Sequence, residues 1–180
     1  MKKYLTLIPT LIIFAIIHEG LHALIAYIYG EYAGFHVKPF GFEVIFITPV
    51  EERSGLMWGF ISGTSNIATI LMGYLMATFL NRFQKLPNYY VRSFSYYLMI
   101  FLLLLDPLNI SIGPLIYGGD AEGIAVGFGI NRWLVQGIFF IIFILNRELI
   151  AQKIIPAYRI KTRHPFFIPW FTKHKVAIDA

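Results

Sequence analysis

The residues most able to do chemistry are two histidines and a glutamate near the start of the chain, His18, Glu19 and His22. They form the pattern His-Glu-x-x-His. Residues four apart on an α-helix lie on the same face, so both imidazoles can reach one ion. For zinc, such a bond is about 2.0–2.1 Å long. Glu19 can accept a proton from a water molecule that attacks a carbonyl group while the ion polarises the carbonyl oxygen.

Two histidines do not complete a catalytic metal site, because a third protein ligand and an open position for water are also needed. The candidates are acidic residues that follow in apolar surroundings: Asp106 and Asp120, with Glu122 as a weaker third. Asp120 follows two glycines, which would allow the backbone to turn and present its carboxylate. Asp106 precedes Pro107, which frees a backbone carbonyl one turn earlier. The residues themselves leave this choice open.

The composition places the motif in a membrane protein. Of the 180 residues, 57% are apolar, 17% are aromatic and 14% are charged. A water-soluble domain has about 45–50% apolar and about 25% charged residues, so an ordinary soluble domain is excluded. Disorder is excluded as well, because disordered chains are rich in charge and poor in aromatic residues. The chain has no cysteine, which excludes disulfides and thiolate metal sites.

The apolar pattern predicts an all-α polytopic membrane protein with about four transmembrane helices, one of them broken, and a small interfacial β-hairpin. We expect a transmembrane domain over residues 1–155 and a basic, aromatic juxtamembrane tail over residues 156–180. The hairpin region covers residues 30–53 and turns at Pro39, Phe40 and Gly41. The expected spans are residues 4–29, 55–80, 94–117, which is interrupted at 106–109, and 132–150.

Two expectations concern helix packing. Gly55, Gly59 and Gly63 recur every four residues at the start of the charge-free second span. This spacing leaves a smooth groove, so we expect close contact with another helix rather than a role in chemistry. Residues 121–130 are expected to form a short helix at the surface.

The motifs resemble those of the site-2 protease family of intramembrane zinc metalloproteases. That family has His-Glu-x-x-His in one transmembrane helix and, in a later broken helix, an Asn, a Pro and then an Asp beside glycine. Here the later segment reads Asn-Ile-Ser-Ile-Gly-Pro (residues 109–114), followed by Gly-Gly-Asp (residues 118–120). Between them, Gly-Thr-Ser-Asn (residues 63–66) is similar to the glycine and asparagine of the family's middle core helix, although Thr64 replaces the expected proline. The order of elements from Leu5 to Ile124 also matches.

The resemblance implies a metal site and a reaction. Zinc would be held by His18, His22 and Asp120, with Asp106 as the second choice for the third ligand. Glu19 would be the catalytic base. The implied reaction is the hydrolysis of peptide bonds in transmembrane or membrane-proximal segments by metal-activated water.

The resemblance also implies contacts with a membrane-embedded peptide or protein substrate. Asn66 and Asn109 are similar to polar residues that contact the substrate backbone near the family's site. Because a helical peptide hides its carbonyls, the substrate must unwind, and the predicted strand over residues 41–48 offers an edge on which it could pair.

The basic residues predict the orientation. With four spans, 12 of the 15 Lys and Arg residues lie on the side of the two termini and the loop over residues 81–92. The positive-inside rule then places both termini in the cytoplasm. The tail suits anionic headgroups, so the lipid bilayer is an expected partner and nucleic acid is not. The sequence does not indicate an oligomeric state.

Two other functions remain open. The first is a catalytically silent relative that binds a metal ion or a partner helix. The second is a proton or ion transporter that uses His18, Glu19 and Asp106 as a relay. Each ionisable group at membrane depth costs about 3 kcal/mol on insertion scales, so any of these functions would explain the cluster better than chance.

Overall fold

The computed structural model describes residues 5–38, 41–116 and 119–171. Four helical segments are long and apolar enough to cross a membrane, and together with one two-stranded sheet they confirm the all-α polytopic fold. In chain order the elements are α1 (Leu7–Ile28), β1 (Tyr32–Lys38), β2 (Gly41–Phe46), the short helix η2 (Val50–Glu52), α2 (Leu56–Thr78), α3 (Leu80–Phe83), α4 (Tyr89–Ser111), η3 (Gly113–Leu115), α5 (Asp120–Phe128), α6 (Arg132–Leu149), the π-helical turn η4 (Ile150–Ile154), α7 (Ile155–Ala157) and η5 (Pro165–Phe167).

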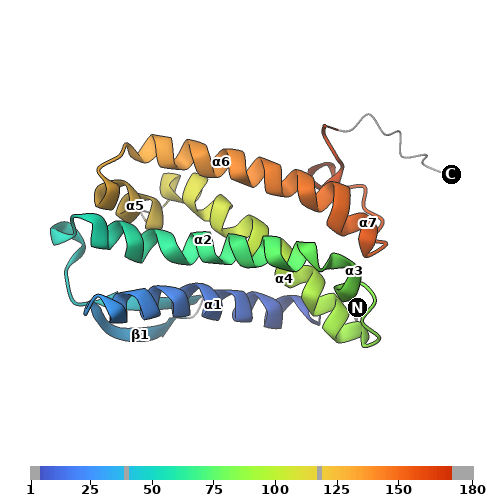
Figure 1. The fold of residues 1–180 in the computed structure, drawn as a ribbon, viewed down its shortest axis with the longest axis horizontal. Coiled ribbons are helices and arrows are strands. Elements are labelled where there is room, and N and C mark those ends of the chain that lie inside the picture. The colour runs from blue at the N-terminus through green and yellow to red at the C-terminus, as the bar shows by residue number, and fades with distance from the viewer. Residues whose placement is uncertain (1–4, 39–40, 117–118, 172–180) are drawn as a thin grey trace.

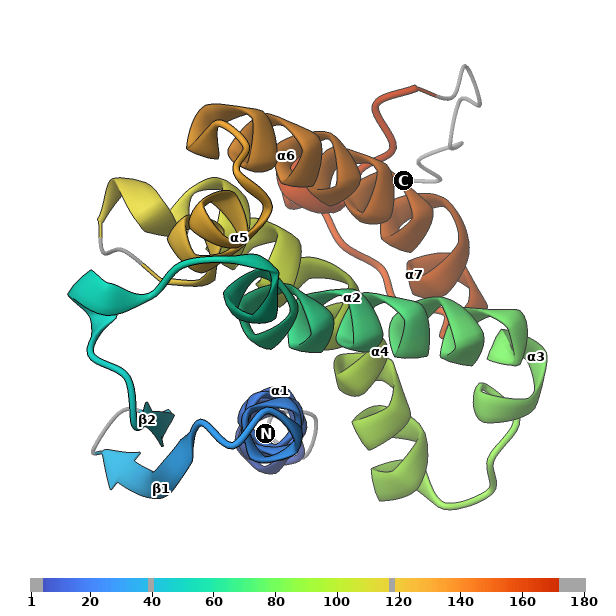
Figure 2. The ribbon, with the colours of Figure 1, turned by 60° about the vertical axis from the view of Figure 1, so that its left-hand side comes forward.

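Helix α2 lies in the middle of the bundle, where it contacts α1, α4 and α5, and α6 packs on α4 and α5. The turn between α2 and α4 lies at the same end of the molecule as α7, whereas α5 and the hairpin lie at the other end (Figures 1 and 2). Large apolar side chains on the outward faces, such as Ile12, Leu75 and Ile141, are exposed. This is the pattern of helices whose outer faces meet lipid.

The hairpin lies against α1. Its strands pair antiparallel, with Tyr32 opposite Phe46 and Lys38 opposite Gly41. Of the three predicted turn residues, Pro39 and Phe40 lie outside the described residues, and Gly41 is the first residue of β2. Strand β2 contacts α1, and Val44 of this strand is buried. The hairpin therefore forms a wall next to the helix that carries the histidine motif.

The third span is broken, but later than the sequence suggests. The α-helix continues through Pro107 and ends at Ser111. A proline has no N–H, so the carbonyl of Leu103, one turn earlier, loses its helical donor. Asn146 of α6 donates its side-chain Nδ2 to this carbonyl at 2.7 Å and so replaces the missing bond. At the actual end of the helix, Gln136 Nε2 donates to the Ser111 carbonyl at 3.0 Å.

Two span boundaries differ from those expected. The third span begins at Tyr89 rather than at residue 94, because the Asn88 side chain caps the helix by accepting the N–H groups of Tyr90 and Val91. The fourth span extends beyond residue 150 to Ala157, through the π-helical turn η4. The additional residues of this span thus lie on its C-terminal side.

Helix α5 is not the surface helix expected from the sequence, because it packs closely on α2. A Cβ atom built on Gly127 would lie 2.0 Å from the backbone nitrogen of Gly59, and one on Gly123 would lie 2.0 Å from Ser62 Oγ. The predicted helix contact at Gly59 is therefore observed, with α5 as the partner. A Cβ on Gly63 would lie 3.5 Å from the Ile124 side chain, which is ordinary contact.

The described part of the tail folds back onto the end of α6. Arg147 is completely buried and pairs with Glu148 at 2.5 Å. The Arg147 guanidinium also donates to the backbone carbonyls of Phe166, at 2.5 Å, and Pro165, at 3.1 Å. Glu148 accepts the backbone N–H of Trp170 at 3.1 Å. This buried ion pair thus joins a segment of the predicted juxtamembrane tail to the helical bundle.

Candidate metal centre

The two histidines of the motif lie on the buried face of α1. The Nε2 atoms of His18 and His22 are 3.2 Å apart, as expected for residues one turn apart that point toward a common centre. Both side chains are buried, although the helix as a whole is poorly covered by protein. Glu19, between them in the sequence, is partly exposed and lines the adjoining cavity.

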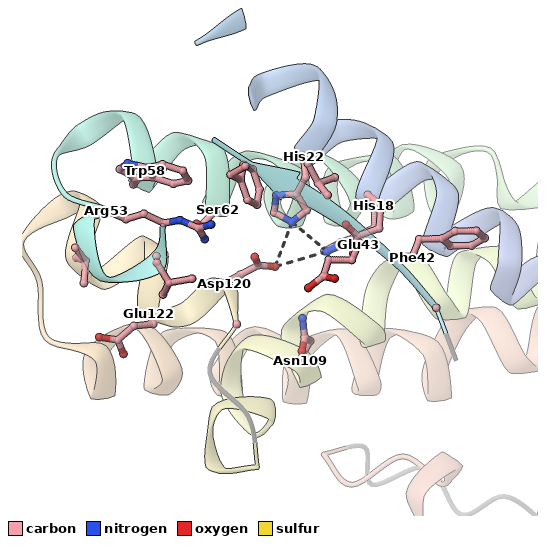
Figure 3. Close-up of a pocket in the computed structure, with 18 of the residues that line it drawn as sticks. His18, His22, Phe42, Glu43, Arg53, Trp58, Ser62, Asn109, Asp120 and Glu122 are labelled. Atoms are coloured by element: carbon pink, nitrogen blue, oxygen red, sulfur yellow. Dashed lines mark hydrogen bonds and ion pairs between the residues drawn. The ribbon is translucent and has the colours of Figure 1, made fainter. Parts of the chain in front are cut away.

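Asp120 joins the two histidines from the start of α5. Its Oδ2 atom lies 3.3 Å from His22 Nε2 and 3.6 Å from His18 Nε2 (Figure 3). Gly119, with φ of +88°, immediately precedes it, a backbone conformation that favours glycine. The glycine thus lets the chain turn sharply into α5 and present the carboxylate, as the sequence suggested.

The triangle of donor atoms has dimensions that suit a metal ion. Ligand atoms about 2.0–2.1 Å from zinc in a tetrahedral site are about 3.3–3.4 Å from one another. The three separations here are 3.2, 3.3 and 3.6 Å. Two imidazoles and a carboxylate are also the ligands of many catalytic zinc sites, which leave the fourth position open. The side chains present therefore fit the ion that the motif implies.

Each imidazole has a polar neighbour at its other nitrogen. His18 Nδ1 lies 2.9 Å from Oδ1 of Asp106, and His22 Nδ1 lies 2.8 Å from the carbonyl of Ile61. Metal-binding histidines typically have this second contact, to a carboxylate or a backbone carbonyl, which fixes the tautomer and the ring orientation. The structure thus places Asp106 behind His18 rather than in the donor triangle, which favours Asp120 as the third ligand.

Helix α2 provides further polar contacts. Asn66 is completely buried, and its Nδ2 atom donates to Asp120 Oδ2 at 2.9 Å. Asn66 does not line the cavity, so this contact differs from the substrate contact predicted for it, which stays a prediction. The Thr69 hydroxyl contacts Asp106 Oδ2. The Ser65 hydroxyl lies 2.7 Å from His22 Nε2.

Ser65 and Thr69 were not identified as site residues from the sequence. A signal was present, because Ser62, Ser65, Asn66 and Thr69 recur at spacings of three and four residues in a span without charges. Such a spacing aligns them on one face of the helix. A polar stripe of this kind in an apolar helix points to a buried polar partner.

The donor triangle adjoins a cavity of about 740 Å³ between α1, the hairpin and α5. Glu19 and Asn109 both line it, so Asn109 lies where its predicted substrate contact could form (Figure 3).

Burial by itself would raise the pKa of the Asp120 carboxyl. The imidazoles of His22 and His18 outweigh this effect and hold its pKa well below the usual range.

Comparisons of the chain with protein-family models, with curated proteins and with solved structures find no match. The function must therefore be argued from the site itself.

Proposed function

We propose that this chain is an intramembrane zinc metalloprotease that hydrolyses peptide bonds of transmembrane or membrane-proximal segments. One observation carries the proposal: two imidazole nitrogens and one carboxylate oxygen form a triangle of metal-site dimensions beside a cavity that Glu19 lines. The membrane-spanning fold supports an embedded substrate, and the resemblance to the site-2 protease family suggests the same reaction.

The chain's own residues have distinct roles in this proposal. His18, His22 and Asp120 would hold the ion, and Asn66 fixes the carboxylate of Asp120. Glu19 takes the proton from the attacking water and passes it to the amide nitrogen that leaves. Zinc, when bound, would supply the Lewis acid that lowers the pKa of water and polarises the scissile carbonyl.

The substrate enters as an extended segment. A helical peptide keeps its carbonyls in its own hydrogen bonds, so it must unwind before a water molecule can attack. Strand β2 and Asn109 both border the cavity and offer backbone and side-chain partners for the unwound segment. In this proposal the distribution of Lys and Arg sets the orientation of the chain in the membrane, with both termini in the cytoplasm.

The proposal is tested with the purified chain in lipid nanodiscs. We expect one zinc ion per chain by elemental analysis and cleavage of a peptide with about 20 apolar residues. Glu19→Gln should keep the ion and lower the cleavage rate by about 100-fold or more, because the base is lost. Glu52→Gln, which removes an exposed carboxylate outside the cavity, is the matched control and should cleave normally.

Each alternative function has its own outcome in this experiment. Unimpaired cleavage by Glu19→Gln would overturn the catalytic role of Glu19. Bound zinc without cleavage of any peptide would indicate a silent metal-binding relative. A metal-free chain that moves protons across a vesicle membrane would indicate the relay.

A further inference from the structure

Arg53 is a cavity residue that the proposed reaction does not use. It lies between η2 and α2, with its guanidinium carbon 4.7 Å from the ring centre of Phe46 and 4.5 Å from that of Trp58. These two rings contact each other edge to face, and Trp58 is buried. Figure 3 shows the guanidinium of Arg53 near Trp58 and turned toward the side of the cavity that holds His22 and Asp120. The rings of Phe46 and Trp58 thus hold the Arg53 cation at the cavity, beside the candidate metal centre.

The near part of the Arg53 side chain is fixed, and its far end faces the cavity. Nε donates to the Thr48 carbonyl at 3.1 Å, and Thr48 is itself held by Glu31, which accepts its N–H at 3.0 Å and its hydroxyl at 2.9 Å. Within the described residues, no carboxylate lies within ion-pair distance of Arg53. Burial lowers the pKa of the guanidinium, and Glu31 and Glu51 partly oppose this effect. The group still stays charged at neutral pH, because arginine titrates far above neutrality.

Away from the donor triangle, the other charged side chains of the cavity wall are acidic or already paired. Its other described cation, Lys38, is already paired with Glu43 at 2.5 Å. Acidic side chains also line the wall, namely those of Glu19, Asp120 and Glu122, of which Glu122 is paired with Arg132 at 3.2 Å. Apart from the donor triangle, where the proposed ion would lie, a negatively charged group of a substrate can therefore be bound at the planar donor face of Arg53. Guanidinium is well suited to this task, because it binds a carboxylate through two parallel hydrogen bonds.

We propose that Arg53 forms a subsite for the carboxylate of an acidic side chain that flanks the scissile bond of the peptide substrate. This inference deepens the proposed function and rests on it. The subsite would fix the register of the unwound segment, because the carboxylate is held at Arg53 while the bond to be cut lies at the donor triangle. A substrate with Asp or Glu at one particular position would then be preferred over its amide counterpart.

Peptide binding tests the subsite without requiring cleavage. The Glu19→Gln protein in phosphatidylcholine nanodiscs is titrated with fluorescent peptides of about 20 apolar residues, each carrying one Glu at a different position near its centre. The matched peptides carry Gln instead. At one or two adjacent positions, the Glu peptide should bind about 10-fold tighter or more, the usual gain from hydrogen bonds to a charged group.

Variants of the chain identify the cation responsible. Arg53→Gln in the same background should remove the preference for Glu, and Arg53→Glu should reverse it in favour of a Lys peptide. Arg82→Gln is the matched control, because Arg82 also stacks on an aromatic ring, that of Phe79, but at the far end of α2. Arg82→Gln should keep the full preference. The comparison of Glu and Gln peptides uses an unaltered Arg53, so it is informative even if an Arg53 variant does not fold.

Three results would overturn the subsite. The first is equal binding of the Glu and Gln peptides at every position. The second is a preference that persists in Arg53→Gln. The third is tighter binding of the Gln peptide at every position, which would mean that the cavity repels a carboxylate instead of binding it. Failure of the protease proposal looks different, because the wild-type chain would then bind no zinc or cleave no peptide while the binding preference could still be measured.

Discussion

At the scale of single residues, the choice between the two aspartates depends on which ring nitrogen each one meets. Asp120 faces the Nε2 atoms that point to the common centre, whereas Asp106 contacts Nδ1 of His18 from behind. A carboxylate behind a ligand orients the imidazole and raises its basicity, whereas one in the triangle would bind the ion directly. The two residues therefore contribute to one site by different means.

Substitution of each aspartate should separate these roles. We expect Asp120→Asn to lose most of its bound zinc, because the charged ligand is gone. Asp106→Asn should retain the ion with an affinity lowered by about 10- to 100-fold, the usual effect of losing an outer contact. Zinc affinity is measured by competition with a chelator in detergent. Glu52→Gln, which removes an exposed carboxylate outside the cavity, is the control. Complete loss in Asp106→Asn with retention in Asp120→Asn would reverse the assignment.

At the scale of elements, α2 is the platform on which the site is assembled. Its backbone carbonyl at Ile61 holds His22, and its side chain Asn66 holds Asp120. Helix α5 can bring Asp120 to this platform because glycines allow its backbone to touch that of α2 near Gly59. The packing of two helices thus sets the position of one candidate ligand.

A methyl group added where α5 touches α2 should disturb the candidate metal centre, although it lies outside that centre. Gly127→Ala would place a Cβ 2.0 Å from the Gly59 nitrogen, so α5 must shift. Such overpacking typically costs about 1–3 kcal/mol, and the shift should also weaken zinc binding through Asp120. Thermal unfolding and zinc competition measure the two effects. Gly137→Ala is the control, because nothing lies within 4 Å of a Cβ there. Equal behaviour of the two variants would contradict the packing argument.

At the scale of the whole molecule, charge separates the two ends of the bundle. The end with α3 and the folded tail is rich in Lys and Arg, and its acidic Glu148 is buried against Arg147. The opposite end, with the hairpin and the cavity, carries most of the acidic residues, including Glu43, Glu51 and Glu122. The positive-inside rule predicts that the first end is cytoplasmic and that the cavity lies toward the other side.

The native chain lacks cysteine, so this orientation can be tested with single cysteine substitutions in an otherwise unchanged sequence. We expect Glu51→Cys, on the hairpin side, to react with a membrane-impermeant maleimide in intact cells. Lys85→Cys, in the turn between α3 and α4, should react only after the membrane is opened, because that turn faces the cytoplasm. The reverse pattern of labelling would place the cavity on the cytoplasmic side.

Much of the fold was predictable because it depends on local patterns. Runs of apolar residues identified a membrane protein and its approximate spans. Runs of β-forming residues next to turn residues identified the hairpin. The boundaries at Asn88 and Ala157 were missed, since a side-chain cap and a π-helical turn leave little trace in hydropathy. The continuous helix through Pro107 was also missed, because its freed carbonyl is bound by Asn146, which is distant in sequence.

By itself, the sequence determined that His18 and His22 could share an ion, because spacing within one helix fixes their common face. Only the tertiary structure decided which acidic residue stands in the triangle and which stands behind it. It also decided that Asn66 holds Asp120 and that Arg53 lies at the cavity. These contacts join segments that are far apart in the chain. They depend on how the helices pack, which cannot be read from the spacing of residues within one segment.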